Sequence, residues 1–246
     1  MIRTKPKTTD TVTIADRFNG PAKSANGGYA SGLLVRSIEG AAQVILRRPP
    51  PVGVELTVEH IGDAVALRRG ETTVATGTPA SIDLESPRPP TFGQALDVSA
   101  GYAGFTDHPF PTCFVCGPSR REGDGLRIFP GSLPGRQIMA APWIPDQELA
   151  DAQGLVRPEF VWAALDCPTG WATSLLPPVE KVVVLGTLAV AIRHRPQAGR
   201  HLVLVCWPIG SEGRKFRAGA ALWSDAGLMA IAQSTWIQVS GDGWAA

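Results

Sequence analysis

Two long apolar stretches, each followed by short alternating segments, dominate the hydrophobic pattern of this chain. The first stretch predicts a helix over residues 29–43, directly after the turn-forming Asn26-Gly27-Gly28. The second predicts a helix over residues 158–175, with Pro158 in the favoured first turn and Pro177-Pro178 ending it. Both stretches are apolar on nearly every side, which is typical of helices that are buried in a core.

Short segments in which apolar and polar residues alternate follow each predicted helix, and this period indicates β-strands. The alternation is clearest in Glu55-Leu56-Thr57-Val58-Glu59. Asp225-Ala226-Gly227 stands where a hairpin turn is expected, and the proline-rich residues 86–90 predict a connector. We predict strands at residues 12–15, 43–48, 55–60, 64–70, 73–83, 125–129, 137–143, 182–194, 200–209, 215–224 and 228–239.

The same order of elements, a helix and then a set of strands, occurs twice along the chain, and such self-similarity predicts a repeat architecture. The predicted fold class is α+β, in which each repeat has a long central helix wrapped by a curved antiparallel sheet. We expect residues 1–90 and 91–246 to join edge to edge in one pseudo-symmetric unit, because neither part could cover its own sheet edge. Only the second helix carries an acid: Asp166 lies where the first helix has Val35.

Charge and composition exclude some functions but do not select one. The 246 residues include 23 basic and 22 acidic side chains, a net charge of +1, so nothing points to nucleic acid or to an anionic membrane. The polar residues 1–10 lack the apolar core of a signal peptide. The longest apolar run, residues 182–192, falls short of the roughly 20 residues that span a bilayer. The expected location is the cytoplasm.

Four cysteines are present, and only two of them have a spacing typical of metal or redox sites. These two form Cys113-Phe114-Val115-Cys116, whereas Cys167 and Cys206 stand alone. A zinc site usually needs a second cysteine pair or a histidine pair, and neither follows in the sequence. We therefore predict structural cysteines, no metal and no cofactor, with metal or redox chemistry as the alternative.

Three segments resemble the thioesterase superfamily with the hotdog fold. Phe18-Asn19-Gly20-Pro21 followed by Asn26-Gly27-Gly28-Tyr29 is similar to the helix start of TesB-like acyl-CoA thioesterases. The run from Cys113-Phe114-Val115-Cys116-Gly117 through Gly125-Leu126 to Ala164-Leu165-Asp166 is similar to PaaI-like thioesterases. Residues 227–233, ending in Gln233, resemble the last strand of TesB-like enzymes. The resemblance covers residues 18–239 and implies a double-hotdog fold and hydrolysis of a fatty or aromatic acyl thioester.

One motif departs from the family pattern. PaaI-like enzymes usually carry His-Gly-Gly at the start of the catalytic helix, where this chain has Arg157-Pro158-Glu159. Pro158 has no amide hydrogen to offer a thioester carbonyl. The amide of Glu159 or Phe160, or an amide near Gly28, would then hold the oxyanion with help from the helix dipole.

The resemblance assigns roles to particular residues. Asp166, between Leu165 and Cys167, would be the base or nucleophile, and burial would raise its pKa. Gln233 and a threonine, either Thr169 or Thr187, would position water. The remaining candidates for substrate contact are Asn26, Gly27, Gly28, Glu159, Phe160 and Trp162, with Trp162, Trp171 and Trp207 for an acyl tunnel and residues 193–195 for a coenzyme A phosphate.

Structural roles compete with these assignments. Asp166 could instead be satisfied by local backbone amides, and Gln233 could face solvent. The expected partner is an acyl-CoA or an acyl thioester on a carrier protein, and exposed sheet edges would allow a homo-oligomer. Two other functions stay open: a non-catalytic acyl-thioester or lipid-binding protein, and an enoyl-thioester hydratase. The hydratase is the weaker class, because no histidine closely follows Asp166 in the sequence.

Overall fold

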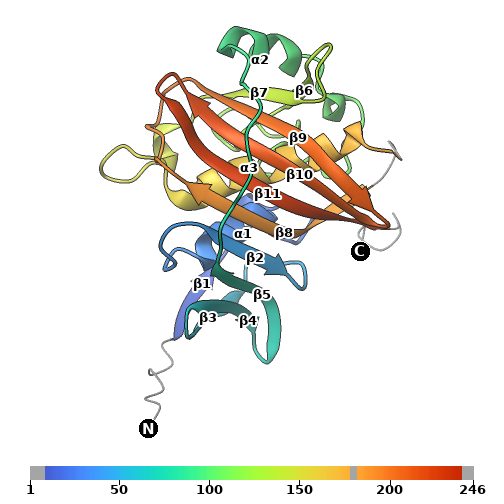
Figure 1. Cartoon of the computed structure of the whole chain (residues 1–246). Coiled ribbons are helices and arrows are strands. Elements are labelled where there is room, and N and C mark those ends of the chain that lie inside the picture. Colours follow the sequence, from blue (N-terminus) through green and yellow to red (C-terminus); the bar gives the residue numbers. More distant parts are fainter. Residues whose placement is uncertain (1–8, 178–181, 240–246) are drawn as a thin grey trace.

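The computed structural model describes residues 9–177 and 182–239, and within these ranges the strands form one continuous antiparallel sheet (Figure 1). Its strand order is β1-β3-β4-β5-β2-β8-β11-β10-β9-β7-β6. The strands are β1 (Thr9–Thr13), β2 (Ala42–Leu46), β3 (Glu55–Ile61), β4 (Ala64–Arg69), β5 (Thr72–Pro79), β6 (Gly131–Ser132), β7 (Met139–Trp143), β8 (Val182–Ile192), β9 (Leu202–Glu212), β10 (Lys215–Ser224) and β11 (Gly227–Val239).

The sheet continues from one part of the chain into the other through the pairing of β2 with β8. These are the first strands after helix α1 (Gly27–Leu34) and helix α3 (Pro158–Ala172), respectively. Outward from this junction the order is β2-β5-β4-β3-β1 on one side and β8-β11-β10-β9-β7-β6 on the other. The strands that follow each helix are thus arranged in the same order on both sides.

The two central helices differ in length. Helix α3 begins at Pro158 as predicted and continues into a short 3-10 turn, η4 (Thr173–Leu175). Helix α1 ends at Leu34, so the prediction that it would reach residue 43 was wrong. The chain turns back through Gly40, whose φ of +78° favours glycine, and enters β2 at Ala42.

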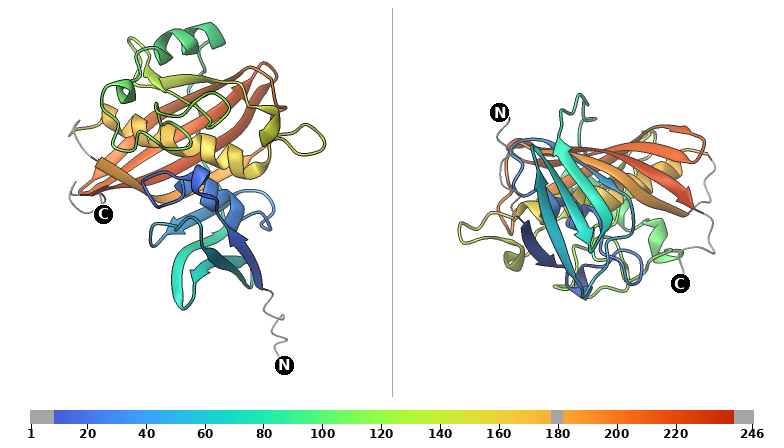
Figure 2. Two further views of the ribbon diagram at one scale, coloured as in Figure 1. Left: turned by 180° about the vertical axis from the view of Figure 1, so that it is seen from behind. Right: turned by 90° about the horizontal axis from the view of Figure 1, so that it is seen from below.

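Helices α1 and α3 pack with almost no space between their backbones (Figure 2). A Cβ atom on Gly28 would lie 2.6 Å from the carbonyl oxygen of Trp162, and one on Gly32 would lie 2.6 Å from the Cα of Glu159. Because both positions lack a side chain, the start of α1 can lie directly against the middle of α3. This contact brings Asn26 and Gly28 next to Asp166.

The part of the sheet around β11 carries apolar side chains on both faces. Ala230 and Ala232 belong to the core cluster that includes α3, whereas Ile231 belongs to a second cluster on the opposite face. The connector after β5 crosses this opposite face, where Ile82 and Leu84 pack against it (Figure 1). Alternation along β11 therefore decides which side chains can reach α3.

One further local prediction was wrong, and one helix was missed. Residues 125–129 form no strand, and the short β6 follows them at Gly131. Helix α2 (Phe92–Ser99) was not predicted, although Thr91 and Gln94 form a capping box at its start, with each side chain bonded to the other residue's backbone N–H. No helix in the described ranges is both long and apolar enough to cross a membrane.

Candidate active site

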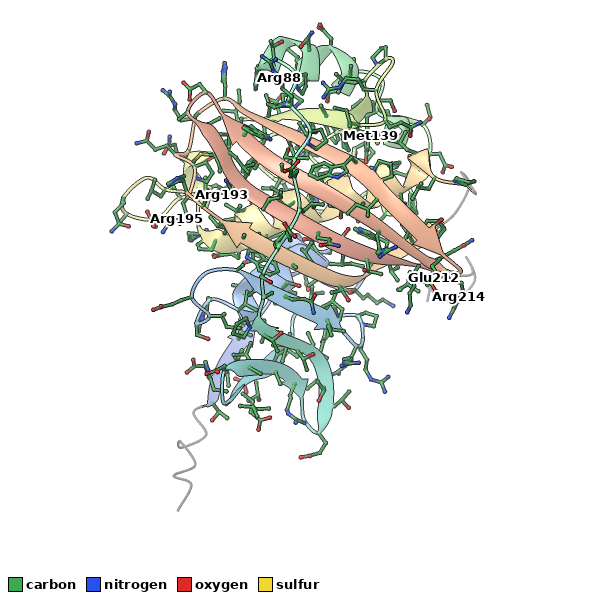
Figure 3. All side chains as sticks on the ribbon, in the orientation of Figure 1. Arg88, Met139, Arg193, Arg195, Glu212 and Arg214 are labelled. Atoms are coloured by element: carbon green, nitrogen blue, oxygen red, sulfur yellow. The ribbon has the colours of Figure 1, made fainter. Side chains whose placement is uncertain are left out.

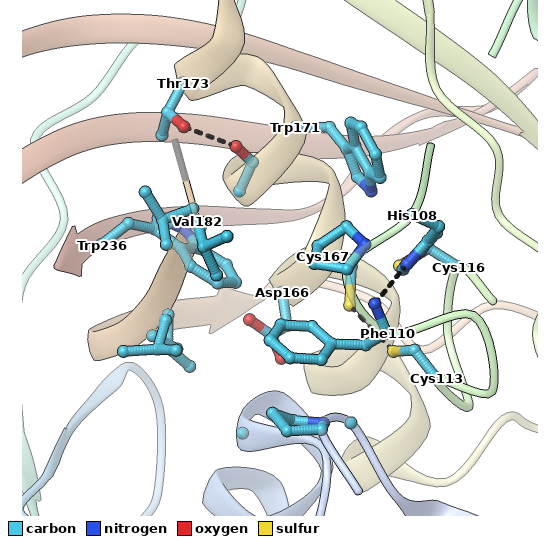
Figure 4. A pocket seen from close by; sticks show the side chains of 18 of the residues that line it. His108, Phe110, Cys113, Cys116, Asp166, Cys167, Trp171, Thr173, Val182 and Trp236 are labelled. Carbon is cyan, nitrogen blue, oxygen red and sulfur yellow. Dashed lines mark hydrogen bonds between the residues drawn. The ribbon is translucent and has the colours of Figure 1, made fainter. Parts of the chain in front are cut away.

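A cavity of about 720 Å³ opens where the start of α1 meets the C-terminal half of α3. The start of β8 forms one wall and residues 103–116 form another (Figure 4). Its lining is mostly apolar. The ionisable side chains that line it are Asp107, Asp166, His108 and three cysteines, Cys113, Cys116 and Cys167.

Asp166 is held in a fixed orientation at this cavity. Its Oδ2 accepts hydrogen bonds from the Asn26 side-chain amide and from the Gly28 backbone N–H, both at 2.8 Å. Asp166 is only 2% exposed, and its buried Oδ1 has no hydrogen-bond partner among the described residues. One carboxylate oxygen is thus fixed by α1, and the other remains able to accept a proton.

Burial is the main influence on the Asp166 carboxyl group. Desolvation raises its pKa to about 7, while the hydrogen bond from Gly28 lowers it, the nearby Cys113 thiolate raises it and the hydrogen bond from Asn26 lowers it. The sequence prediction that burial would raise this pKa is confirmed.

Asn26 connects the cap of α1 to the candidate acid. Its Oδ1 accepts the Tyr29 N–H at 2.9 Å, the usual N-cap hydrogen bond. Since Oδ1 is used in the cap, the Nδ2 amide points at Asp166 and also approaches the Cys167 sulfur at 3.4 Å. Gly27, the first residue of the helix, lines the cavity.

Three cysteines that are scattered in the sequence meet in the structure. The Sγ atoms of Cys113, Cys116 and Cys167 all lie within 4.8 Å of one another, and Cys113 and Cys167 are 3.5 Å apart. Hydrogen bonds from the other two thiols hold the pKa of Cys113 well below its usual range. Spacing in the sequence missed this cluster because Cys167 comes from α3, 54 residues after Cys113.

His108 contacts the cysteine cluster through one ring nitrogen. Its Nδ1 accepts the Phe110 N–H at 2.8 Å, and its Nε2 lies 3.3 Å from the Cys116 sulfur (Figure 4). An amide N–H can only donate, so Nδ1 carries no proton and Nε2 donates to the sulfur. Burial also lowers the pKa of His108. Both ring nitrogens are engaged, which leaves His108 without the free nitrogen that a hydratase base would need.

Gln233 and Thr187 are not brought to Asp166. Trp236 of β11 reaches α3, where its Nε1 donates to Thr169 Oγ1 at 2.8 Å. Strict alternation then places Gln233 with Ile231 on the opposite face of the sheet. Thr187 pairs with Thr235 and shares that face. The two residues lie on the wrong side of the sheet for the water-positioning role that the resemblance implied.

Thr169 lies next to the site but its hydroxyl is already used. Its Oγ1 donates to the backbone oxygen of Asp166 at 2.7 Å and accepts the Trp236 N–H. The side chain is fully buried and does not line the cavity. Thr169 therefore supports the helix that carries Asp166 and does not reach the cavity.

The residues at the start of α3 also lie away from the cavity. Glu159 pairs with Arg157 at 3.5 Å, Phe160 packs among the rings of Phe18, Tyr29 and Phe114, and Trp162 packs against Gly32. None of the three lines the cavity. The Gly28 amide N–H donates to Asp166, so it is not free to act as the expected oxyanion donor.

The remaining residues predicted to contact substrate lie at different ends and on different faces of the sheet. Trp171 lines the cavity, whereas Trp207 belongs to the cluster on the opposite face. Arg193 and Arg195 lie at the far end of β8 from Val182, which lines the cavity (Figure 3). Arg195 forms an ion pair with Asp151 there. The expected phosphate contact of residues 193–195 is therefore not near this cavity.

Comparisons with known proteins support the fold. No family model matches the chain, and no curated protein matches it either. The tesB protein MAP1729c of Mycobacterium avium subsp. paratuberculosis is similar over 94% of this chain and 93% of its own, with a TM-score of 0.62 and 12% identity. The acyl-CoA thioesterase II TesB2 of Mycobacterium marinum is similar over 94% and 93%, with a TM-score of 0.59 and 10% identity.

A protein of unknown function with a hot dog fold from Alicyclobacillus acidocaldarius is also similar, over 95% of this chain and 93% of its own. Its TM-score is 0.54 at 12% identity. At such identities the likeness shows the fold alone. The chain has the hotdog fold of TesB-like thioesterases, as its sequence motifs predicted.

Proposed function

We propose that this protein hydrolyses an acyl thioester in the cavity beside Asp166. The observation that carries the proposal is the fixed, buried carboxylate that lines an apolar cavity and has one oxygen without a partner among the described residues. Hydrolysis needs a base beside a site that excludes bulk water, and this arrangement supplies both.

In the proposed reaction, Asp166 acts as the general base. Its Oδ1 takes a proton from a water molecule whose oxygen attacks the thioester carbon. The tetrahedral intermediate then collapses, the carbon–sulfur bond breaks, and the proton passes from Asp166 to the departing thiolate. Asn26 and Gly28 hold Oδ2 throughout, so that Oδ1 keeps its direction. The products are a carboxylic acid and a free thiol.

The start of α1 is the proposed site for the developing oxyanion. Gly27 lines the cavity, and amides in the first turn of a helix have no partner within the helix. The positive end of the helix dipole favours negative charge at the same place. This role passes to Gly27 because the Gly28 amide already donates to Asp166.

The proposed substrate is an acyl-CoA with a fatty or aromatic acyl group. Phe110, Trp171, Trp236 and Leu185 give the cavity an apolar surface that suits such a group. One protein of similar fold is named an acyl-CoA thioesterase, which supports this substrate class.

We also propose that residues 1–90 and 91–246 are two hotdog repeats. The matching strand order around α1 and α3, joined through β2 and β8, supports this interpretation. The candidate site then belongs to both repeats, since one supplies the donors and the other supplies the acid.

The decisive experiment is a thiol-release assay with short, long and aromatic acyl-CoAs. Asp166→Asn should lower kcat by about 10²–10⁴-fold, because it removes the general base with little change in shape. Asp97→Asn, at an exposed position on α2, is the matched control and should leave kcat unchanged. Equal turnover in the wild type and Asp166→Asn would contradict the proposal.

A second candidate, a non-catalytic acyl-thioester binding protein, is favoured by one contact. The Gly28 amide, the expected oxyanion donor, is occupied by Asp166. A binding protein would raise its melting temperature with acyl-CoA and release no thiol from any substrate. The same assay, run beside a thermal-shift titration, separates the two functions.

A further inference from the structure

We propose that Cys113, Cys116 and Cys167 together bind a zinc ion at the wall of the cavity. Their three Sγ atoms lie within 4.8 Å of one another. Zinc–sulfur bonds of about 2.3 Å in a tetrahedral site place sulfur atoms about 3.8 Å apart. The observed cluster is already close to this arrangement, and small side-chain rotations would complete it.

The segment around the Cys-x-x-Cys pair is built as a firm support for two of the ligands. The Gly117 N–H donates to the Cys113 carbonyl oxygen at 2.9 Å and closes the turn that brings the two cysteines together. Leu126 and Ile128 donate their N–H groups to Phe114 and Val115, which fixes the middle of the turn. Cys167 approaches from helix α3, so the metal would join this segment to the helix that carries Asp166.

The chemistry of the three thiols suits a thiophilic cation. All three are buried, and the Sγ atoms of Cys113 and Cys167 lie 3.5 Å apart, within hydrogen-bond distance. Zinc binding would replace the thiol protons with three zinc–thiolate bonds. Thiolate ligands select zinc, copper(I) or iron–sulfur clusters over magnesium and calcium, and a compact group of single sulfur ligands fits zinc.

His108 has a supporting place in this site. The Phe110 N–H occupies its Nδ1, so its Nε2 carries the proton and donates to the Cys116 sulfur. A nitrogen that carries a proton cannot bind a metal, and His108 therefore orients a thiolate ligand from outside the coordination sphere. All three cysteines line the cavity.

This assignment stands apart from the proposed hydrolysis, because its test measures metal and not turnover. Freshly purified wild-type protein should contain about one zinc per chain, measured by mass spectrometry of the elements. After chelation and reduction it should bind Co²⁺ and develop the charge-transfer and d–d bands of tetrahedral cobalt thiolate. Zinc X-ray absorption should detect three sulfur neighbours at about 2.3 Å.

Variants distinguish the cluster from the remaining thiol. Cys113→Ser and Cys167→Ser should reduce bound zinc to trace levels, whereas Cys206→Ser should retain it. Cys206 is the matched control because it is equally buried but lies on β9, next to the Met139 carbonyl and outside the cluster. His108→Gln should keep the metal with affinity about 10-fold weaker.

Several outcomes would overturn the assignment. Wild-type protein without zinc that also binds no Co²⁺ after reduction would do so, as would full metal content in Cys113→Ser. A Cys113–Cys167 disulfide in place of metal would assign the cluster to redox chemistry instead. Loss of metal in His108→Gln as complete as in Cys113→Ser would make His108 a ligand and contradict the three-thiolate site. If the serine variants do not fold, the X-ray absorption result on wild-type protein decides.

Discussion

Helices α1 and α3 hold corresponding places in the two parts of the sheet, yet they contribute opposite chemistry to one site. The start of α1, a helix of eight residues, supplies hydrogen-bond donors from the side chain of its N-cap Asn26 and from the Gly28 amide. The fifteen residues of α3 supply the acceptor, Asp166, and the neighbouring thiol of Cys167. Val35, which the sequence pattern predicts as the counterpart of Asp166, is the C-cap of the shorter helix.

The two helices therefore have different roles at this site: the start of α1 supplies donors, and α3 supplies the carboxylate that accepts them. The Asn26 and Gly28 donors of α1 point across to Asp166 on α3. A single carboxylate held by the opposite helix therefore ties the two parts together. Single substitutions in α1 or α3 test these roles, because each one removes a single contact.

The largest expected effect on stability comes from separating the two helices. In Gly28→Ala the new Cβ would lie 2.5 Å from the Asp166 Cβ, so a backbone must move, at a cost of about 3 kcal/mol in the free energy of unfolding. Gly93→Ala on α2 is the control, because its Cβ would meet nothing within 4 Å and should stabilise the helix slightly. Urea denaturation measures both, and equal stability of the two variants would refute the close helix contact.

Removal of the donor from α1 should have the next largest effect. Asn26→Ala deletes the N-cap and one hydrogen bond to Asp166, and should lower the free energy of unfolding by about 2 kcal/mol. Thr91→Ala removes only the exposed cap of α2 and should cost about 1 kcal/mol. The difference between these two losses in the free energy of unfolding measures the contribution of the Asn26 hydrogen bond to Asp166. A loss no larger than that of Thr91→Ala would mean that this contact contributes nothing.

On α3, the support of Asp166 by Thr169 should contribute less. Thr169→Val removes the acceptor for the Trp236 N–H and should lower the melting temperature, with a cost of about 1 kcal/mol. Ser174→Ala, which removes a hydroxyl bonded to the Trp171 carbonyl near the end of the same helix, is the control and should cost less. A Thr169→Val variant as stable as Ser174→Ala would argue against this support.

The smallest effect is expected away from both helices. Gln233→Ala should leave thioester hydrolysis unchanged and alter the free energy of unfolding by less than about 0.5 kcal/mol, because the side chain lies on the opposite face from Asp166. The thiol-release assay used for Asp166→Asn measures this directly. A loss of activity comparable to that of Asp166→Asn would restore Gln233 to the site.

Much of the fold could be predicted from the sequence, because alternation and turn residues act locally. The strand at residues 215–224 and the start of α3 at Pro158 were predicted where the structure has them. Helix α1 was predicted too long, because an apolar run does not show where the chain must turn back to join the sheet. Helix α2 carried a readable signal in Thr91 and Gln94, which the neighbouring prolines obscured.

By itself, the sequence determined the hotdog elements, the acid on the second helix and the Asn26-Gly27-Gly28 segment at the start of the first as part of the site, since periodicity, turn chemistry and motif order are properties of neighbouring residues. Only the tertiary structure decided which side chains meet. The alternation of β11 excluded Gln233, and the helix contact joined Asn26 to Asp166. The same packing brought Cys167 to Cys113 across 54 residues. Such contacts depend on packing between distant segments, which no local pattern encodes.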